Sequence, residues 1–127
     1  MFSVIDVETT GFSPLNGDRI VEIGIVRMDS DGIIPGGFET LIKHERGTGP
    51  AHIHGITDSM VLQAPRFSEI ACDILEFIKE TYIVAHNADF DMGFLKNEFA
   101  RLGADFSFPV FCTLKMARAI LPNLPTR

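Results

Sequence analysis

The order of apolar segments is the feature that most restricts how this chain can fold. Residues 2–7 form a short, β-branched apolar run, and polar and glycine residues at 9–11 interrupt it, as expected for a buried strand followed by a loop. Two more β-rich runs, 20–28 and 33–42, flank the turn sequence Asp-Ser-Asp-Gly at 29–32. These runs predict one strand followed by a β-hairpin.

The second half of the chain alternates between the helical and the strand period. Asn87 is placed to cap the second predicted helix, Gly103 to end it, and Pro122 to end the third. The predicted elements are a helix at 67–78, a strand at 82–85, a helix at 88–102, a strand at 108–112 and a helix at 113–121.

A hairpin followed by two strand-helix alternations predicts a single α/β domain with a mixed sheet. The first, fourth and fifth strands should be parallel, with helices packed against the faces of the sheet. Parallel strands place functional groups at their C-terminal ends. Residues that follow the first strand and residues that follow the fourth should therefore lie close together.

The segment 44–66 is long for a connection inside a compact domain. It contains three of the four histidines, His44, His52 and His54, together with several glycines and prolines. Loops of this length are often functional. We expect this loop to contribute to a site.

The net charge restricts how the chain can meet a nucleic acid. Hydrophobic residues make up 46% of the sequence, which indicates a globular protein, and the formal net charge is -6. An acidic chain has no general basic surface to neutralise phosphates, so any contact with nucleic acid must be local. Bound cations can supply such local attraction.

The cysteines and the apolar runs argue against a disulfide-rich, a zinc-binding or a membrane-spanning protein. Cys72 and Cys112 lie forty residues apart, without the spacing of a disulfide framework or a zinc site, so we expect two reduced, buried thiols. No apolar run reaches the length of a membrane span, and no signal sequence precedes the first strand. We therefore expect a cytoplasmic protein without membrane contacts.

Two groups of acidic residues indicate a metal site. Asp6 and Glu8 are two residues apart on a strand, so their carboxylates face the same side and repel each other. Either one is protonated or a cation lies between them, and hard oxygen ligands favour Mg²⁺ or Mn²⁺. Asp89 and Asp91 point to different sides of the first turn of the next helix, so only one can face the strand pair. We expect Asp91 to do so and Asp89 to lie in solvent.

Three motifs resemble those of one known family. Asp6-Val7-Glu8-Thr9-Thr10-Gly11 resembles the first exonuclease motif of the DnaQ-like (DEDDh) 3′-5′ exonucleases, which include the proofreading epsilon subunit of bacterial DNA polymerase III. His86-Asn87-Ala88-Asp89-Phe90-Asp91 resembles the second, and His54-Gly55-Ile56-Thr57 resembles the loop between them. Their order and spacing match the family over nearly the whole chain.

The resemblance implies a fold, an activity and a set of site residues. It implies a ribonuclease-H-like, five-stranded mixed sheet in the order 3-2-1-4-5, flanked by helices. It implies removal of nucleoside 5′-monophosphates from the 3′ end of single-stranded DNA, with a DNA polymerase subunit as a partner. Asp6, Glu8 and Asp91 would bind two divalent cations, Mg²⁺ or Mn²⁺, and the terminal nucleotide would contact Thr10, Gly11, His54 and Phe90.

The chain departs from the family at its C-terminal end. The family completes its site with a helix that carries a general-base His and a fourth metal-binding Asp, and no His follows His86 here. We expect a domain over residues 1–127 that is truncated at its C-terminal end, lacks the last helix and is weakly active or inactive. Uncovered apolar sheet surface should then favour self-association.

Two alternatives to a DNA exonuclease remain at this point. The chain can be a noncatalytic module of the same fold that binds nucleic acid or protein, or a relative specific for RNA. His52 and His54 can also ligate a metal, although a third ligand at suitable spacing is missing. We expect His86 to be structural, at the turn from strand to helix.

Overall fold

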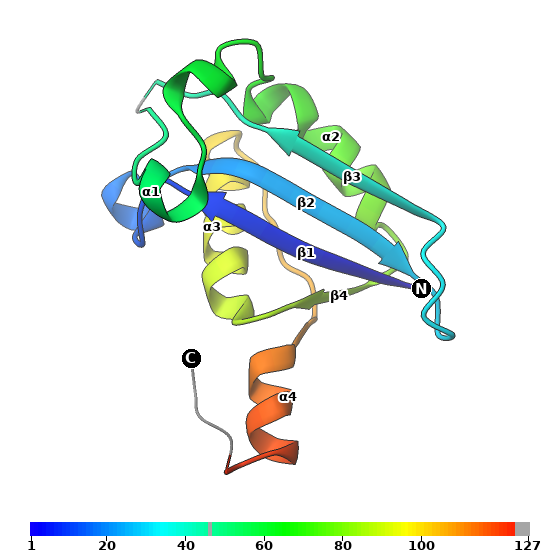
Figure 1. Ribbon diagram of the computed structural model, residues 1–127. Coiled ribbons are helices and arrows are strands. Elements are labelled where there is room, and N and C mark those ends of the chain that lie inside the picture. Colours follow the sequence, from blue (N-terminus) through cyan, green and yellow to red (C-terminus); the bar gives the residue numbers. More distant parts are fainter. Residues whose placement is uncertain (46, 124–127) are drawn as a thin grey trace.

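A mixed five-stranded sheet forms the centre of the protein, in the order β3-β2-β1-β4-β5 (Figure 1). The computed structural model describes residues 1–45 and 47–123. Pro125, which together with Pro122 is expected to break the last helix, lies outside these residues. The strands are β1 (Phe2–Thr9), β2 (Ile20–Met28), β3 (Gly36–Leu41), β4 (Tyr82–Ala85) and β5 (Val110–Cys112). The helices are η1 (Pro14–Asn16), α1 (Ala51–His54), η2 (Asp58–Val61), α2 (Phe67–Ile78), α3 (Ala88–Arg101) and α4 (Thr113–Ile120).

The strand pairing confirms the predicted fold class and sheet order. β1 pairs with β2 and β2 with β3 in antiparallel register, whereas β1–β4 and β4–β5 are parallel. Three boundaries differ from the prediction by more than one residue. β1 continues to Thr9, β3 begins at Gly36 instead of residue 33, and β5 begins at Val110 instead of residue 108. The longer β1 places Asp6 and Glu8 within the strand.

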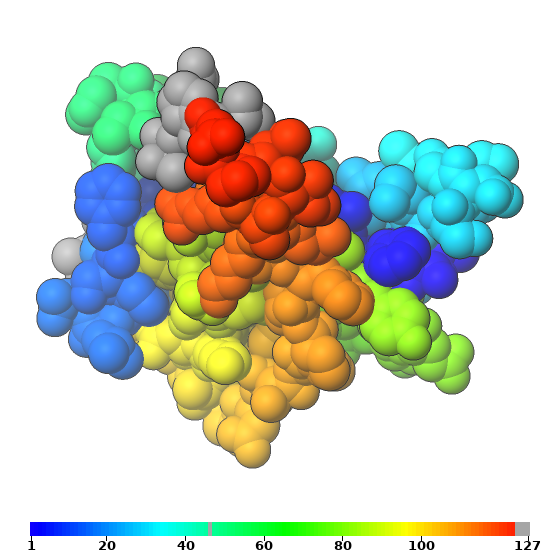
Figure 2. Space-filling view, turned by 90° about the horizontal axis from the view of Figure 1, so that it is seen from below, coloured from blue at the N-terminus to red at the C-terminus, as the bar shows by residue number. Residues whose placement is uncertain are grey.

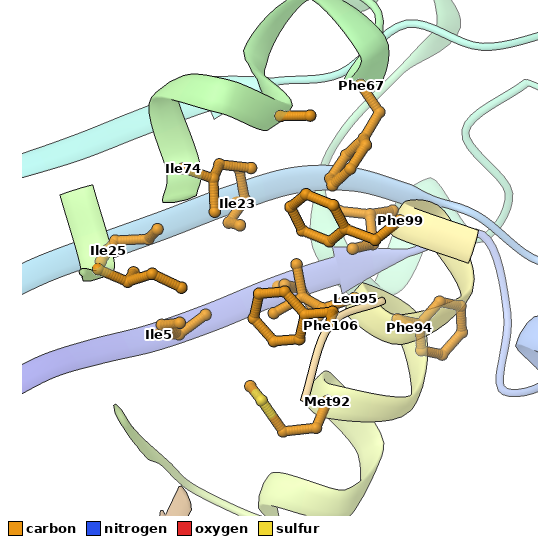
Figure 3. Close-up of a cluster of buried hydrophobic side chains, with 14 of the residues drawn as sticks. Ile5, Ile23, Ile25, Phe67, Ile74, Met92, Phe94, Leu95, Phe99 and Phe106 are labelled. Atoms are coloured by element: carbon orange, nitrogen blue, oxygen red, sulfur yellow. The ribbon is translucent and has the colours of Figure 1, made fainter. Parts of the chain in front are cut away.

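Helices α2 and α3 cover one face of the sheet and build the core against it (Figures 1 and 3). Alternate residues of β1 and β2 point to this face because successive strand residues point to opposite sides. Aromatic rings fill the space between the two helices, with the Phe67 and Phe99 ring centroids 5.2 Å apart. The residues labelled in Figure 3 are Ile5, Ile23, Ile25, Phe67, Ile74, Met92, Phe94, Leu95, Phe99 and Phe106.

The other face of the sheet is covered at one end only. A small buried cluster of Val21, Ile56 and Val61 anchors the segment of α1 and η2 there. This segment is the long loop of the sequence analysis, and it contains two short helices instead of irregular chain alone. Figure 1 shows α1 in front of the end of β1, with α2 and α3 behind the sheet. The end of β1 therefore lies between α1 and α3.

An aromatic row crosses the uncovered part of this face. The Phe2 and Tyr82 ring centroids are 5.9 Å apart, and those of Tyr82 and Phe111 are 6.1 Å apart. Tyr82 and Phe111 keep about half of their surface exposed, 60% and 48%. We call Phe2, Tyr82 and Phe111 the aromatic row.

The turn from β4 into α3 differs from the predicted cap. Asn87 precedes the first helical residue but has a left-handed backbone, with φ of 57°, and its side chain makes no capping hydrogen bond. His86, predicted to be structural, bonds Thr113 Oγ1 through its Nδ1, at 2.9 Å. The turn is thus held partly through the start of α4.

Helix α4 extends away from the rest of the domain (Figure 1), and in the view from below it occupies the centre of the surface beside α3 (Figure 2). None of its residues is buried.

Both cysteines are free, as expected, but Cys72 is exposed and Cys112 half-buried, so the expectation of two buried thiols was wrong. Cys72 lies on the solvent side of α2, and Cys112 at the start of α4.

Across residues 1–45 and 47–123, no helix is both long enough and apolar enough to cross a membrane.

The aromatic row should drive concentration-dependent association of the 127-residue chain, because an exposed apolar patch gains free energy when another apolar surface covers it. Phe111→Ser should lower the mean mass measured by light scattering at high protein concentration. Leu15→Ser is the matched control, since Leu15 is exposed but lies outside the row. A wild-type chain that stays a monodisperse monomer at every concentration contradicts this expectation.

Candidate active site

Strand β1 presents two carboxylates on the face opposite to the core. Ile5 and Val7 are buried under the helices, while Asp6 is exposed and Glu8 partly exposed. The alternation of the strand produces this separation. The prediction that Asp6 and Glu8 share one face therefore agrees with the structure.

Asp91 approaches β1 from the first turn of α3. Its Oδ2 accepts a hydrogen bond from the Val7 backbone N–H, with an N···O distance of 3.1 Å. The last residue of β1 that pairs with β4 is Val4, so the Val7 N–H lies beyond β4, and the Asp91 carboxylate satisfies it. This bond holds a buried carboxylate, 4% exposed, beside the residues that carry Asp6 and Glu8.

Asp89 lies on the other side of the same helical turn. Its side chain is 84% exposed and forms a surface ion pair with Lys115 of α4, at 3.2 Å. The geometry of the helix thus separates the two acids as expected.

The electrostatics of the site couple the three acids. Burial and, to a lesser degree, the Asp6 carboxylate together raise the pKa of Asp91 to about 7, although the Val7 N–H opposes this shift. Burial and Asp6 also raise the pKa of Glu8, while His54 lowers it. Asp91 and Glu8 are therefore destabilised as anions by their surroundings.

The donor set suits a divalent cation. All three side chains offer carboxylate oxygens, which hard cations such as Mg²⁺ prefer, and a cation would relieve their mutual repulsion. Within the described part of the chain, no three His, Cys, Asp or Glu side chains stand close enough to enclose an ion as they are placed. Asp91 is fixed by Val7, so closing around a cation would need movement of the more exposed Asp6 and Glu8.

The loop after β1 is ordered by Asp18. Thr10 Oγ1 donates to Asp18 Oδ1 at 2.9 Å, and the Ser13 N–H donates to Oδ2 at 3.1 Å. The Asp18 carboxylate lies so close to Gly11 that a Cβ there would stand 2.5 Å from Oδ2. A Cβ at Gly11 would therefore displace the Asp18 carboxylate, which holds the Thr10–Gly11 backbone in one arrangement.

A second set of bonds fixes His54 in the loop that faces β1. The Ile56 N–H donates to His54 Nδ1 at 3.0 Å, so Nδ1 is an acceptor and Nε2 carries the hydrogen, which it donates to the Thr48 carbonyl at 2.8 Å. Both ring nitrogens are engaged within the loop. His52 is exposed, and nothing in the described structure joins it to His54 as a metal ligand.

The two loops touch through Gly49. Its Cα lies against the Thr10 backbone, and its φ of 74° is in the left-handed region. Asp58 holds the base of this loop, because its Oδ1 accepts hydrogen bonds from both the N–H and the Oγ1 of Thr48. The loop that carries His54 is thereby docked on the loop that carries Thr10 and Gly11.

Aromatic side chains border this region. Phe90 of α3 is half-buried, and its ring centroid lies 6.5 Å from that of Phe12, which is 84% exposed. Phe12 was not identified from the sequence, although its position directly after the first motif could have indicated it. Phe12 and Phe90 together offer apolar surface beside the Thr10–Gly11 segment.

An ion pair ties the same segment to α3. Arg19 donates to both oxygens of the buried Glu98, at 2.6 Å and 2.8 Å. The Arg19 backbone exchanges hydrogen bonds with Thr10, because its N–H donates to Thr10 Oγ1 and its carbonyl accepts from the Thr10 N–H. Neither Arg19 nor Asp18 was identified from the sequence, since their partners become visible only in the folded chain.

A family model described as exonuclease (RNase_T) matches residues 3–127 of the chain. The chain belongs to this exonuclease family. The resemblance to DnaQ-like exonucleases is thereby confirmed, and it covers nearly the whole sequence.

Curated relatives include subunits of bacterial replicative polymerases. The DNA polymerase III subunit epsilon of Treponema pallidum (strain Nichols) is 44% identical over 126 residues, covering 97% of this chain and 58% of the relative. That of Pasteurella multocida (strain Pm70) is 36% identical over 130 residues, covering 94% and 51%. The chain thus spans about half the length of these relatives. A DNA polymerase III PolC-type of Clostridium perfringens (strain 13 / Type A) is 38% identical over 125 residues but matches along only 8% of its length.

The solved structures agree in fold. Exonuclease I of E. coli, in complex with a dT13 oligonucleotide, superposes with a TM-score of 0.82 at 23% identity, covering 98% of this chain and 31% of that one. At this level of identity the match supports the ribonuclease-H-like fold.

The pKa of Asp91 predicts how stability depends on pH when metal is chelated. A carboxyl group with a pKa of 3.8 in the unfolded chain and about 7 in the folded chain contributes stability at low pH that is lost as the pH rises through about 7. Asp91→Asn keeps an acceptor for the Val7 N–H and removes the buried charge. By thermal unfolding, this variant should be more stable than wild type at about pH 8, and the difference should shrink toward about pH 4. Asp89→Asn should leave the profile unchanged, and an Asp91→Asn protein less stable at the higher pH would contradict this.

Gly49 and Gly55 provide a matched pair for the docking of the two loops. Both have a φ of 74°, but a Cβ at Gly49 would collide with the Thr10 backbone, whereas one at Gly55 meets nothing within 4 Å. Gly55→Ala should cost about 1 to 2 kcal/mol of unfolding free energy for its left-handed backbone alone. Gly49→Ala should cost clearly more in urea unfolding, because the loops must also separate. Equal losses would show that the contact with Thr10 contributes nothing.

Proposed function

We propose that this chain is the nucleolytic domain of a metal-dependent 3′-5′ exonuclease that removes nucleoside 5′-monophosphates from the 3′ end of single-stranded DNA. The observation that carries the proposal is the bond between Asp91 and Val7, which brings the acid of the second motif to the strand that carries the acids of the first. Membership of the exonuclease family supports the reaction class.

In this proposal Asp6, Glu8 and Asp91 hold two divalent cations, Mg²⁺ or Mn²⁺. When bound, such cations activate a water and stabilise the charge that develops on the phosphodiester and the leaving 3′ oxygen. Asp91 contributes a donor that the Val7 N–H keeps in place, and Asp6 and Glu8 contribute the donors that can adjust.

The two docked loops and the aromatic pair would orient the terminal nucleotide. Thr10 and Gly11 present a backbone held by Asp18, and Phe90 offers an apolar surface on which a base can stack. Both His54 ring nitrogens form hydrogen bonds inside the loop, so we do not assign His54 a role in proton transfer. We propose that its ring contacts the terminal nucleotide and that its bonds keep the loop in shape.

The setting of the enzyme also forms part of the proposal. The epsilon relatives are subunits of DNA polymerase III, and the exonuclease I structure holds a dT13 oligonucleotide. By analogy we propose a cytoplasmic proofreading or repair role, with a polymerase subunit as partner. The 127-residue chain should turn over slowly, because the family's general-base His and fourth Asp have no counterpart in it.

Substitution of each acid tests the proposal. Asp6→Asn, Glu8→Gln and Asp91→Asn should each reduce release of labelled mononucleotide from a 3′-labelled single strand by about 100-fold or more, since transition-state stabilisation is lost. Asp89→Asn is the control and should retain activity, because Asp89 lies in the same helical turn as Asp91 but is exposed. Release should require Mg²⁺ or Mn²⁺ and disappear with chelator.

Three results would count against this function. The first is a wild-type protein extended by the residues encoded after Arg127 that binds DNA but releases no nucleotide, which is the behaviour of a noncatalytic module. The second is an Asp89→Asn loss as large as that of Asp91→Asn. The third is a rate on RNA of equal sequence far above that on DNA, which would make the chain an RNA exonuclease that reads the 2′-hydroxyl.

A further inference from the structure

A cationic cavity lies at the other end of α3 from Asp91. It measures about 170 Å³ and is bounded by the C-terminus of α3, the N-terminus of α2 and the residues that follow β3. Among the residues that the structure describes, four Lys and Arg side chains line the cavity, together with the carboxylates of Glu45 and Glu98. The four are Arg19, Lys43, Arg66 and Arg101.

Internal pairing leaves part of this charge without a balancing acid. Arg19 is fully engaged with Glu98, and Arg66 approaches Glu45 at 3.7 Å, where both side chains are mostly exposed. Lys43 Nζ reaches only the Leu62 carbonyl, at 3.5 Å, and Arg101 forms no ion pair with another described residue. Lys43 and Arg101 therefore contribute uncompensated positive charge to the cavity.

The two helix ends at the cavity act in opposite directions, because α2 presents its positive N-terminus and α3 its negative C-terminus. A cation in the last turn of α3 is favourable for the helix dipole, which accounts for Arg101. Arg66, however, stands at the N-terminus of the twelve-residue helix α2, where the dipole is already positive and a cation is unfavourable. Glu69 accepts the Arg66 N–H and offsets this in part. Helix stability alone does not explain why cations converge here.

The walls of the cavity continue into the loops of the active site. Arg19 is bonded to Thr10, and Lys43 leads directly into the loop that holds Thr48 and His54. Along α3, ten residues separate Asp91 from Arg101, a rise of about 15 Å. A few nucleotides of single strand can span that distance.

We propose that this cavity binds a backbone phosphate of the DNA strand, a few nucleotides on the 5′ side of the nucleotide being removed. The inference rests on the proposed function, since it assumes a strand whose 3′ end lies at Asp6, Glu8 and Asp91. The cavity supplies the local attraction that a chain of net charge -6 needs to hold a polyanion. Lys43 and Arg101 are the main phosphate ligands.

Salt-dependent binding tests the site separately from catalysis. Fluorescence anisotropy would be measured with labelled dT12 and dT2 in chelator, for wild type, Lys43→Gln/Arg101→Gln and the control Lys79→Gln/Arg118→Gln. The control removes the same charge from exposed positions outside the cavity. For dT12, the slope of log affinity against log salt should fall by about 1.4 in the cavity variant, about 0.7 for each lost contact with a single strand. The control should keep the wild-type slope.

The length of the oligonucleotide locates the contact. The cavity variant should lose affinity for dT12 and not for dT2, because dT2 is too short to reach from the acids to the cavity. Equal slopes in the cavity and control variants, or equal losses for dT2 and dT12, would overturn the proposal, as would a wild type that does not bind dT12.

A cavity variant that loses binding of oligoglutamate but not of dT12 would assign the site to an acidic protein segment and also overturn it. If the chain shows the expected binding but the protein extended by the residues encoded after Arg127 never releases nucleotide, the proposed reaction is refuted and the phosphate site stays in place.

Discussion

The hydrogen bond from the Val7 N–H to Asp91 is the interaction on which the rest of the site depends. β1 runs past the end of its pairing with β4, and a buried N–H at that point needs an acceptor. The first turn of α3 supplies a carboxylate and so fixes how the helix meets the sheet. The same placement removes the carboxylate from water beside Asp6, which raises its pKa. One contact thus joins the packing of the fold to the electrostatics of the site.

Features set by burial could be predicted from the sequence, and features set by backbone geometry could not. The strand and helix assignments and the separation of Asp91 from Asp89 follow from the strand and helix periods, which burial imposes directly, whereas the sheet order was implied by the family resemblance. The start of β3 was predicted too early, because Ile33 and Ile34 are apolar but exposed, and Pro35 cannot donate to the sheet. Asn87 has the composition of a helix cap, but the turn from β4 forces it into a left-handed backbone that its side chain does not cap.

The arrangement around the proposed nucleotide site is made of contacts that no local pattern contains. Arg19 and Glu98 are 79 residues apart, and each looks like an ordinary surface charge in the sequence. Gly49 is required by the Thr10 backbone, and Gly11 leaves room for the Asp18 carboxylate, so both glycines answer to neighbours from other segments. The motifs locate the loops, whereas these partners determine the shape in which the loops are held.

In the proposed function, the distribution of charge along α3 reconciles an acidic chain with a polyanionic substrate. The helix carries Asp91 in its first turn and Arg101 in its last, the arrangement that its own dipole favours at both ends. A DNA phosphate would then be repelled mainly at the end that carries the acids, where divalent cations would reverse the repulsion. Attraction at the other end would need no metal, because the cations of the cavity belong to the protein. Total charge would therefore be a poor guide to binding, since a bound strand would meet the order of charges along one helix.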